Sequence, residues 1–155
     1  MSTATTSHRK KDSPLTPIAS EAAVIGSMLL DRGCVPLVWD ILPDGTRFCL
    51  PEHAIIYTEL LAWEPTADAW DLVALRNRLQ ERRLYEAVGE VDYLVRLLES
   101  VPSAASAVYY AKRVHEGWLA RQAMQAAGDL RRELTDGCDI AEQLERTRAR
   151  FTTLA

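Results

Sequence analysis

Histidines and cysteines are the most chemically versatile side chains of this chain, and their spacing does not build a metal site. The chain has three of each; the three histidines lie far apart from one another, and so do the three cysteines. They are His8, His53, His115, Cys34, Cys49 and Cys138. Zinc sites need paired ligands such as C-x-x-C, which is absent. An odd number of scattered cysteines is typical of buried thiols in a reducing compartment, so no metal is predicted.

Catalytic motifs are absent as well. The sequence contains no G-x-x-x-x-G-K-[ST] phosphate loop, no G-x-G-x-x-G, no serine-hydrolase elbow and no H-E-x-x-H. His53 stands two residues after Pro51, where we expect a packed or capping histidine rather than a catalyst. Acidic residues alternate with Lys and Arg, as on a solvated helix face. We therefore predict a chain that is not an enzyme and needs no cofactor; an active site assembled only in three dimensions is the alternative.

Composition restricts the partners. The chain has 155 residues, of which 48% are hydrophobic, which suits one domain with a real core. Its net charge of −4 excludes a global attraction to phosphate backbones, so direct nucleic-acid binding is not expected beyond a local patch. The cluster His8–Lys11 is either a solvated tail or a weak contact for an acidic partner or a nucleic acid. No signal peptide precedes "AAVIGSMLL", and that run is too short for the ~20 residues of a membrane span. We expect a cytoplasmic protein without a membrane contact.

Helical periodicity runs through the chain and strand-like alternation is nearly absent, which predicts an all-α fold. We expect a disordered tail over residues 1–16, a compact multi-helix globular domain over 17–102, and an antiparallel helical hairpin for assembly over 103–155.

Local signals mark the helices of the globular domain. Apolar residues spaced near 3.6 predict a helix over Ile18–Leu30, capped by Thr16 or Ser20. Pro51 suits the first turn of another helix. Asp71 is a good N-cap for a third. The expected core positions after these two starts are Ile55, Ile56, Leu60, Leu61, Leu72, Leu75 and Leu79.

The predicted hairpin begins after Pro102. Ser103 is the expected N-cap of its first helix, which runs to about Leu134. Gly137 suits the turn. The second helix has apolar positions at the 4-3-4-3 spacing of a coiled-coil seam. These positions are Ile140, Leu144, Thr147, Phe151 and Leu154.

The first hairpin helix has more apolar surface than one partner helix can cover. We therefore predict self-association, with packing onto the chain's own domain as the alternative. Tyr109, Tyr110 and Val114 are also expected to anchor the base of the hairpin against the globule. The candidate oligomer interface consists of Tyr109, Tyr110, Val114, Trp118, Leu119, Ile140, Leu144 and Phe151.

Four stretches follow one another in an order that carries a resemblance. They are "SEAAVIGSMLLD", "PEHAIIYTEL", "WDLVALRNRLQERRLYEAVGEVDYLVRL" and "VPSAASAVYYAKRV". Together, over about residues 17–120, the chain resembles the N-terminal domain of bacterial replicative DNA helicases of the DnaB type. Three departures stand out: Glu90 replaces a second Gly, Ser106 replaces an Asn, and Ala22 follows Glu21 in place of Gln.

The resemblance implies a helical globule plus a hairpin. It also implies that hairpins pair between subunits, that six such domains form a collar on the ATPase ring, and that the collar docks the primase C-terminal region or a helicase loader. The ATPase domain is absent from this chain. Two functions are therefore open: a non-catalytic assembly domain of a replicative helicase, or a stand-alone adaptor that binds a host helicase or primase.

Overall fold

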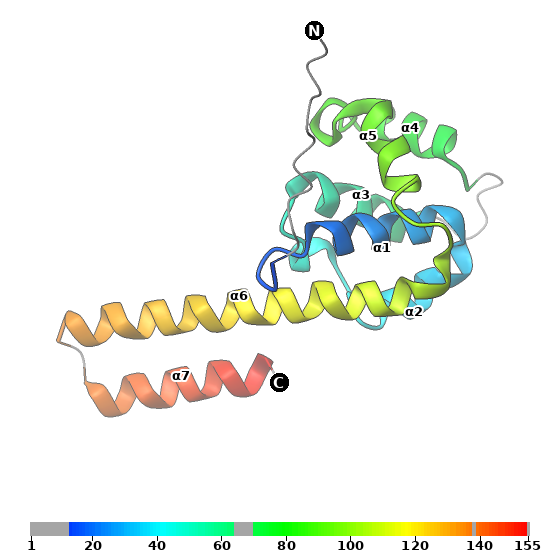
Figure 1. The fold of residues 1–155 in the computed structure, drawn as a ribbon. Coiled ribbons are helices and arrows are strands. Elements are labelled where there is room, and N and C mark those ends of the chain that lie inside the picture. Colours follow the sequence, from blue (N-terminus) through cyan, green and yellow to red (C-terminus); the bar gives the residue numbers. More distant parts are fainter. Residues whose placement is uncertain (1–12, 64–69, 138, 155) are drawn as a thin grey trace, which may run out of the picture.

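The computed structural model describes residues 13–63, 70–137 and 139–154, and Figure 1 shows a bundle of helices with a long arm. The prediction of an all-α fold is confirmed, because the described residues form seven α-helices and no extended strand. The helices are α1 (Ile18–Leu30), α2 (Val35–Trp39), α3 (Pro51–Leu61), α4 (Leu72–Glu81), α5 (Glu90–Leu98), α6 (Ala107–Thr135) and α7 (Ile140–Leu154).

Helix α1 lies at the centre of the globule, with α3, α5 and the first half of α6 packed around it. Val24, Ile25 and Met28 are fully buried. Gly26 allows α5 to come close, because a Cβ there would lie 2.2 Å from the Leu97 carbonyl oxygen. The predicted capping of α1 is wrong: Pro17 occupies the N-cap position, and no side chain caps the helix.

The predicted starts of α3 and α4 are confirmed. Pro51 occupies the first turn of α3. The Asp71 carboxylate accepts a hydrogen bond of 2.8 Å from the Ala74 N–H and caps α4. Leu75 and Leu79 are fully buried, as the stripe on α4 predicted.

Helix α6 has 29 residues and belongs to two parts of the molecule. Ala107, Ala111 and Val114 pack in the core of the globule. The second half extends away from it and runs antiparallel to α7 (Figure 1). The predicted cap at Ser103 is wrong, because its side chain makes no capping hydrogen bond and a 3₁₀ turn over Ala104–Ser106 precedes α6.

The segment before α1 is a turn that lies on α6. The Thr16 N–H donates to the Ser13 carbonyl at 3.0 Å. The predicted disorder therefore does not hold for residues 13–16, because this short segment is held by contacts with α6. Residues 1–12, including His8–Lys11, lie outside the described residues.

Among the described residues, no single helix is both long and apolar enough to cross a bilayer. The pair Ile18–Leu30 and Arg32–Trp39 reaches that length and composition only when taken together, and it is bent by 120°.

Candidate assembly surface

Helix α7 turns its apolar stripe to solvent. Ile140, Leu144 and Phe151 are 63%, 53% and 41% exposed. At about 100° per residue, these positions fall within about 40° of one another around the helix, so they form one stripe. The residue of α7 that is buried against α6 is Gln143, which is 6% exposed. The positions with seam spacing therefore share one side of α7, but that side does not face the other helix of its own hairpin.

An ion pair joins α6 to α7. The Asp129 carboxylate on α6 pairs with Arg150 on α7 at 3.2 Å. The side-chain oxygen of Gln143 is buried and has no hydrogen-bond partner, which carries a free-energy cost. Ala126 is the buried position of α6 in its second half. The side of α7 that is buried against α6 is therefore polar, whereas its apolar stripe faces solvent.

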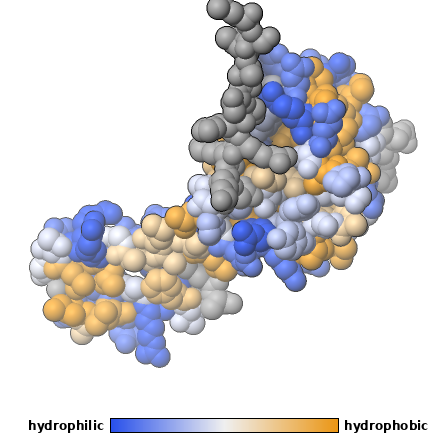
Figure 2. Space-filling model, in the orientation of Figure 1, coloured by the Kyte–Doolittle hydropathy of each residue, from blue (hydrophilic) through white to orange (hydrophobic). Residues whose placement is uncertain are grey.

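Helix α6 carries further apolar surface. Met124 is 61% exposed and Leu134 is 40% exposed. Leu119 and Leu130 are half-buried. Figure 2 shows apolar surface over both helices of the hairpin. We call the stripe on α7 together with Leu130 and Leu134 of α6 the arm surface.

The charges of α7 are separated along the helix. Its first half is acidic and its second half is basic: Asp139, Glu142 and Glu145 precede Arg146, Arg148 and Arg150. This order suits the helix dipole, which favours acids at the start and bases at the end. It is also the order in which a second, antiparallel copy of α7 would place acids opposite bases.

The predicted interface residues at the base of α6 differ in how far their side chains are exposed. Val114 is fully buried in the chain's own core, so it offers no surface to a second chain, and its inclusion in the interface is corrected here. Tyr110 is half-buried against the same core. Tyr109 is 62% exposed and meets the edge of the Tyr110 ring at 5.5 Å. Of these three, Tyr109 is the residue whose side chain is mainly available to a partner.

Trp118 is also engaged within its own chain. It is half-buried, with the Arg47 guanidinium 4.8 Å from its ring centre and the His115 ring stacked on it at 5.7 Å. Burial, and after it Arg47, lowers the pKa of His115, while Glu116 opposes this shift. The aromatic cluster therefore favours a neutral His115.

A buried polar network, missed from the sequence, joins α1, α3 and α5. Glu21 is fully buried and accepts hydrogen bonds from the Cys49 N–H at 2.6 Å and from the His53 ring at 2.8 Å. The other ring nitrogen of His53 lies 2.8 Å from the Tyr93 hydroxyl. The prediction that His53 is a packed histidine is confirmed, since it is 1% exposed. No local signal pairs these residues, because 32 positions separate Glu21 from His53.

The network and the described cysteines are poorly suited to nucleophilic chemistry. Burial, followed by Glu52, raises the pKa of Tyr93 to about 12. Burial, followed by Asp31, raises the pKa of Cys34 to about 11. Burial, followed by Glu21, raises the pKa of Cys49 to about 12. These groups stay protonated near neutral pH, whereas nucleophiles need the opposite shift. Within the described ranges, no cluster of His, Cys, Asp or Glu could hold a metal ion.

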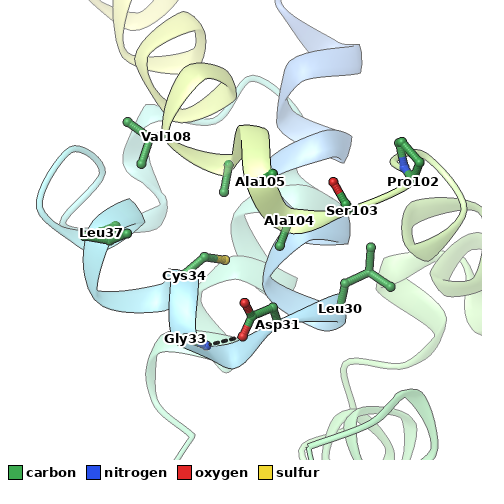
Figure 3. A pocket seen from close by; sticks show the side chains of 11 residues that line it. Leu30, Asp31, Gly33, Cys34, Leu37, Pro102, Ser103, Ala104, Ala105 and Val108 are labelled. Atoms are coloured by element: carbon green, nitrogen blue, oxygen red, sulfur yellow. Dashed lines mark hydrogen bonds between the residues drawn. The ribbon is translucent and has the colours of Figure 1, made fainter.

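A groove of about 590 Å³ lies beside the start of α6, between that helix and the residues that end α1 and follow it. Figure 3 shows Leu30 and Leu37 on one side of it and Ala105 and Val108 on the other. Leu30 and Leu37 are 45% and 55% exposed. Asp31 supplies the carboxylate among the residues that line the groove. This groove is a second apolar surface, separate from the arm surface.

Comparison with known proteins gives a consistent result. The family model of the "DnaB-like helicase N terminal domain" matches residues 13–116. The replicative DNA helicase DnaB of Mycobacterium leprae is 31% identical over 145 residues, which are 92% of this chain and 24% of the relative. The replicative DNA helicase DnaC of Bacillus subtilis is 34% identical over 115 residues, which are 74% of this chain and 25% of the relative. The chain thus spans about a quarter of the length of these relatives.

A solved structure agrees over the whole fold. The crystal structure of the N-terminal domain of DnaB helicase from Mycobacterium tuberculosis superposes with a TM-score of 0.79 and 30% sequence identity. The match covers 91% of this chain and 99% of that structure. The globule and most of the hairpin are therefore shared, and the chain belongs to the family of DnaB-like helicase N-terminal domains.

Proposed function

We propose that this chain is a non-catalytic assembly and docking domain that acts in DNA replication as part of a replicative helicase. The observation that carries the proposal is the stripe of Ile140, Leu144 and Phe151, which has seam spacing and yet faces solvent. Membership of the family and the printed names of the relatives support the link to a helicase. A cytoplasmic location follows from this role.

The partner of the arm surface is a second copy of the chain. A two-fold axis would bring the stripe of one α7 against the stripe of the other in the antiparallel direction. The acidic first half of each α7 then lies opposite the basic second half of its partner. In this arrangement Ile140 of one copy and Phe151 of the other cover each other's exposed surface. Further copies would build the collar.

Leu144→Asp tests the pairing. A carboxylate in the centre of the stripe would lose its water on association without gaining a partner, which costs about 3 kcal/mol. Such a loss weakens association at least about 100-fold. We expect sedimentation velocity to give an assembled wild type at about 100 µM and a monomeric Leu144→Asp variant.

Ala149→Asp is the matched control. Ala149 is exposed and lies about 180° from Ile140 around α7, so it points away from the stripe. The Ala149→Asp variant carries the same new side chain in the same helix as Leu144→Asp, and we expect it to assemble like the wild type. A wild type that stays monomeric at about 100 µM would refute the pairing.

The docking part of the proposal is separate. We propose that the assembled domains bind the primase C-terminal region, a helicase loader, or both. Calorimetric titration of the assembled chain with the C-terminal region of the cognate primase, and then with the loader, tests it. Binding of either partner supports docking, and absence of heat and of co-sedimentation with both rejects it while leaving the assembly result unaffected.

A further inference from the structure

The segment before α1 crosses α6 at the point where that helix leaves the globule. We call residues 13–17 the strap and residues 122–154 the arm. Gly117 lies under the strap: a Cβ there would be 2.8 Å from Pro17 Cδ and 2.9 Å from the Pro14 carbonyl oxygen. Pro17 itself is buried. The strap therefore rests on the α6 backbone at a position that tolerates no side chain.

Arg121, one turn further along α6, ties three segments together. Its guanidinium donates to the Leu15 carbonyl at 2.8 Å and to the Arg47 carbonyl at 2.6 Å. It also lies 2.8 Å from the Cys49 sulfur. The Cys49 thiol in turn reaches the Leu15 carbonyl at 3.7 Å. A planar guanidinium has several N–H donors in fixed directions, as this junction needs, whereas a lysine has a single compact ammonium group.

These contacts shorten the free part of α6. With the strap and Arg121 in place, about 14 residues separate the last anchored position from Thr135, which is about 21 Å of helix. Without the strap and Arg121, the last anchored position would be Trp118, which contacts Arg47, and 17 residues, or about 26 Å, would extend beyond it. A longer free length converts the same small tilt into a larger displacement of the arm surface.

We propose that the strap and Arg121 fix the angle at which the arm leaves the globule, so that Arg121 is a positioning residue for assembly. The fixed angle of the arm is argued from the contacts of the strap and Arg121 alone. Its consequence for assembly rests on the function proposed above. If a released arm spends about a tenth of its time at the angle that permits pairing, each copy loses about tenfold in apparent affinity.

Residual dipolar couplings measure the angle directly. The full chain is ¹⁵N-labelled and partly aligned, in the Leu144→Asp background, so that the readout does not require pairing. With Arg121 intact, amides of α1 and of residues 122–135 of α6 should fit one alignment tensor. In Arg121→Ala, we expect the arm to need a second tensor, with unchanged chemical shifts for α1.

Gly117→Ala perturbs the contact between the strap and α6 from the α6 side, because the added methyl group would displace the strap. It should also give two tensors. Arg131→Ala is the control, because Arg131 is exposed on the free part of α6. A folded Arg121→Ala variant and a folded Gly117→Ala variant that both keep one tensor would overturn the proposal. If Arg121→Ala does not fold, Gly117→Ala decides alone.

Mass measurements separate the two proposals. A monomeric wild type rejects pairing, but the tensors still report on the strap. A wild type that pairs, together with an Arg121→Ala variant that pairs equally well, rejects the role of the strap in assembly. Pairing weakened about tenfold or more by Arg121→Ala, with Arg131→Ala unchanged, supports it.

Discussion

Replacing Glu90 by glycine should stabilise the fold. Glu90 is the first residue of α5 and has φ of 61°, immediately after Gly89 with φ of 82°. An L side chain in the left-handed region costs about 1–2 kcal/mol, which glycine avoids. Glycine also makes the unfolded chain more flexible, and this larger loss of conformational entropy on folding offsets about 0.5–1 kcal/mol of the gain. It also removes a carboxylate from a helix start, where the charge contributes about 0.3 kcal/mol or more. The net gain is about 0.5 kcal/mol.

Glu90→Ala separates the backbone effect from the charge. It removes the same carboxylate and keeps the left-handed strain, so it should lose about 0.3–1 kcal/mol. The difference between the glycine and alanine variants is the sharper quantity, at about 1 kcal/mol, or roughly 2–4 °C in Tm. Urea unfolding followed by circular dichroism at fixed chain concentration measures it. A glycine variant no more stable than the alanine variant would refute the assignment of backbone strain to this position.

Two further perturbations address the interior and the aromatic cluster. Glu21→Ala leaves the buried Cys49 N–H and the His53 ring without an acceptor, so the free energy of unfolding should fall by about 3–5 kcal/mol in urea; a loss below about 1 kcal/mol would contradict the network. Because the folded state lowers the pKa of His115, the unfolded chain binds more protons near the ordinary pKa of 6.5. Stability linked to His115 is therefore present above that pH and lost as the pH falls through the folded pKa, and His115→Gln should flatten the decline in stability below pH 6.5.

Several features that depend on neighbours in the sequence were predictable, although the caps at Thr16 or Ser20 and at Ser103 were not. Asp71 caps α4 through a residue three positions away, and Pro51 needs only its own ring to suit a first turn. The departure at Glu90 was visible as well, since a missing glycine points to a strained backbone position. Its physical reason, the positive φ, appears only in the structure.

Features that depend on distant partners were not predictable. Arg121 donates a hydrogen bond to the Leu15 carbonyl, 106 positions away, and no sequence pattern near either residue predicts this contact. The seam of α7 was visible as a spacing, but periodicity does not say which surface will cover it. The actual rotation places Gln143 against α6, because the Asp129–Arg150 pair also lies on that side.

The exposed stripe of α7 links the folding of this helix to the concentration of the chain. Helix α7 has 15 residues, a length at which isolated helices are marginal in water, and it gains little apolar burial from α6. A second copy that covers the stripe would act as a ligand that binds only the folded helix. The helix content of the chain would then rise with its own concentration, and dilution would melt α7 before the globule.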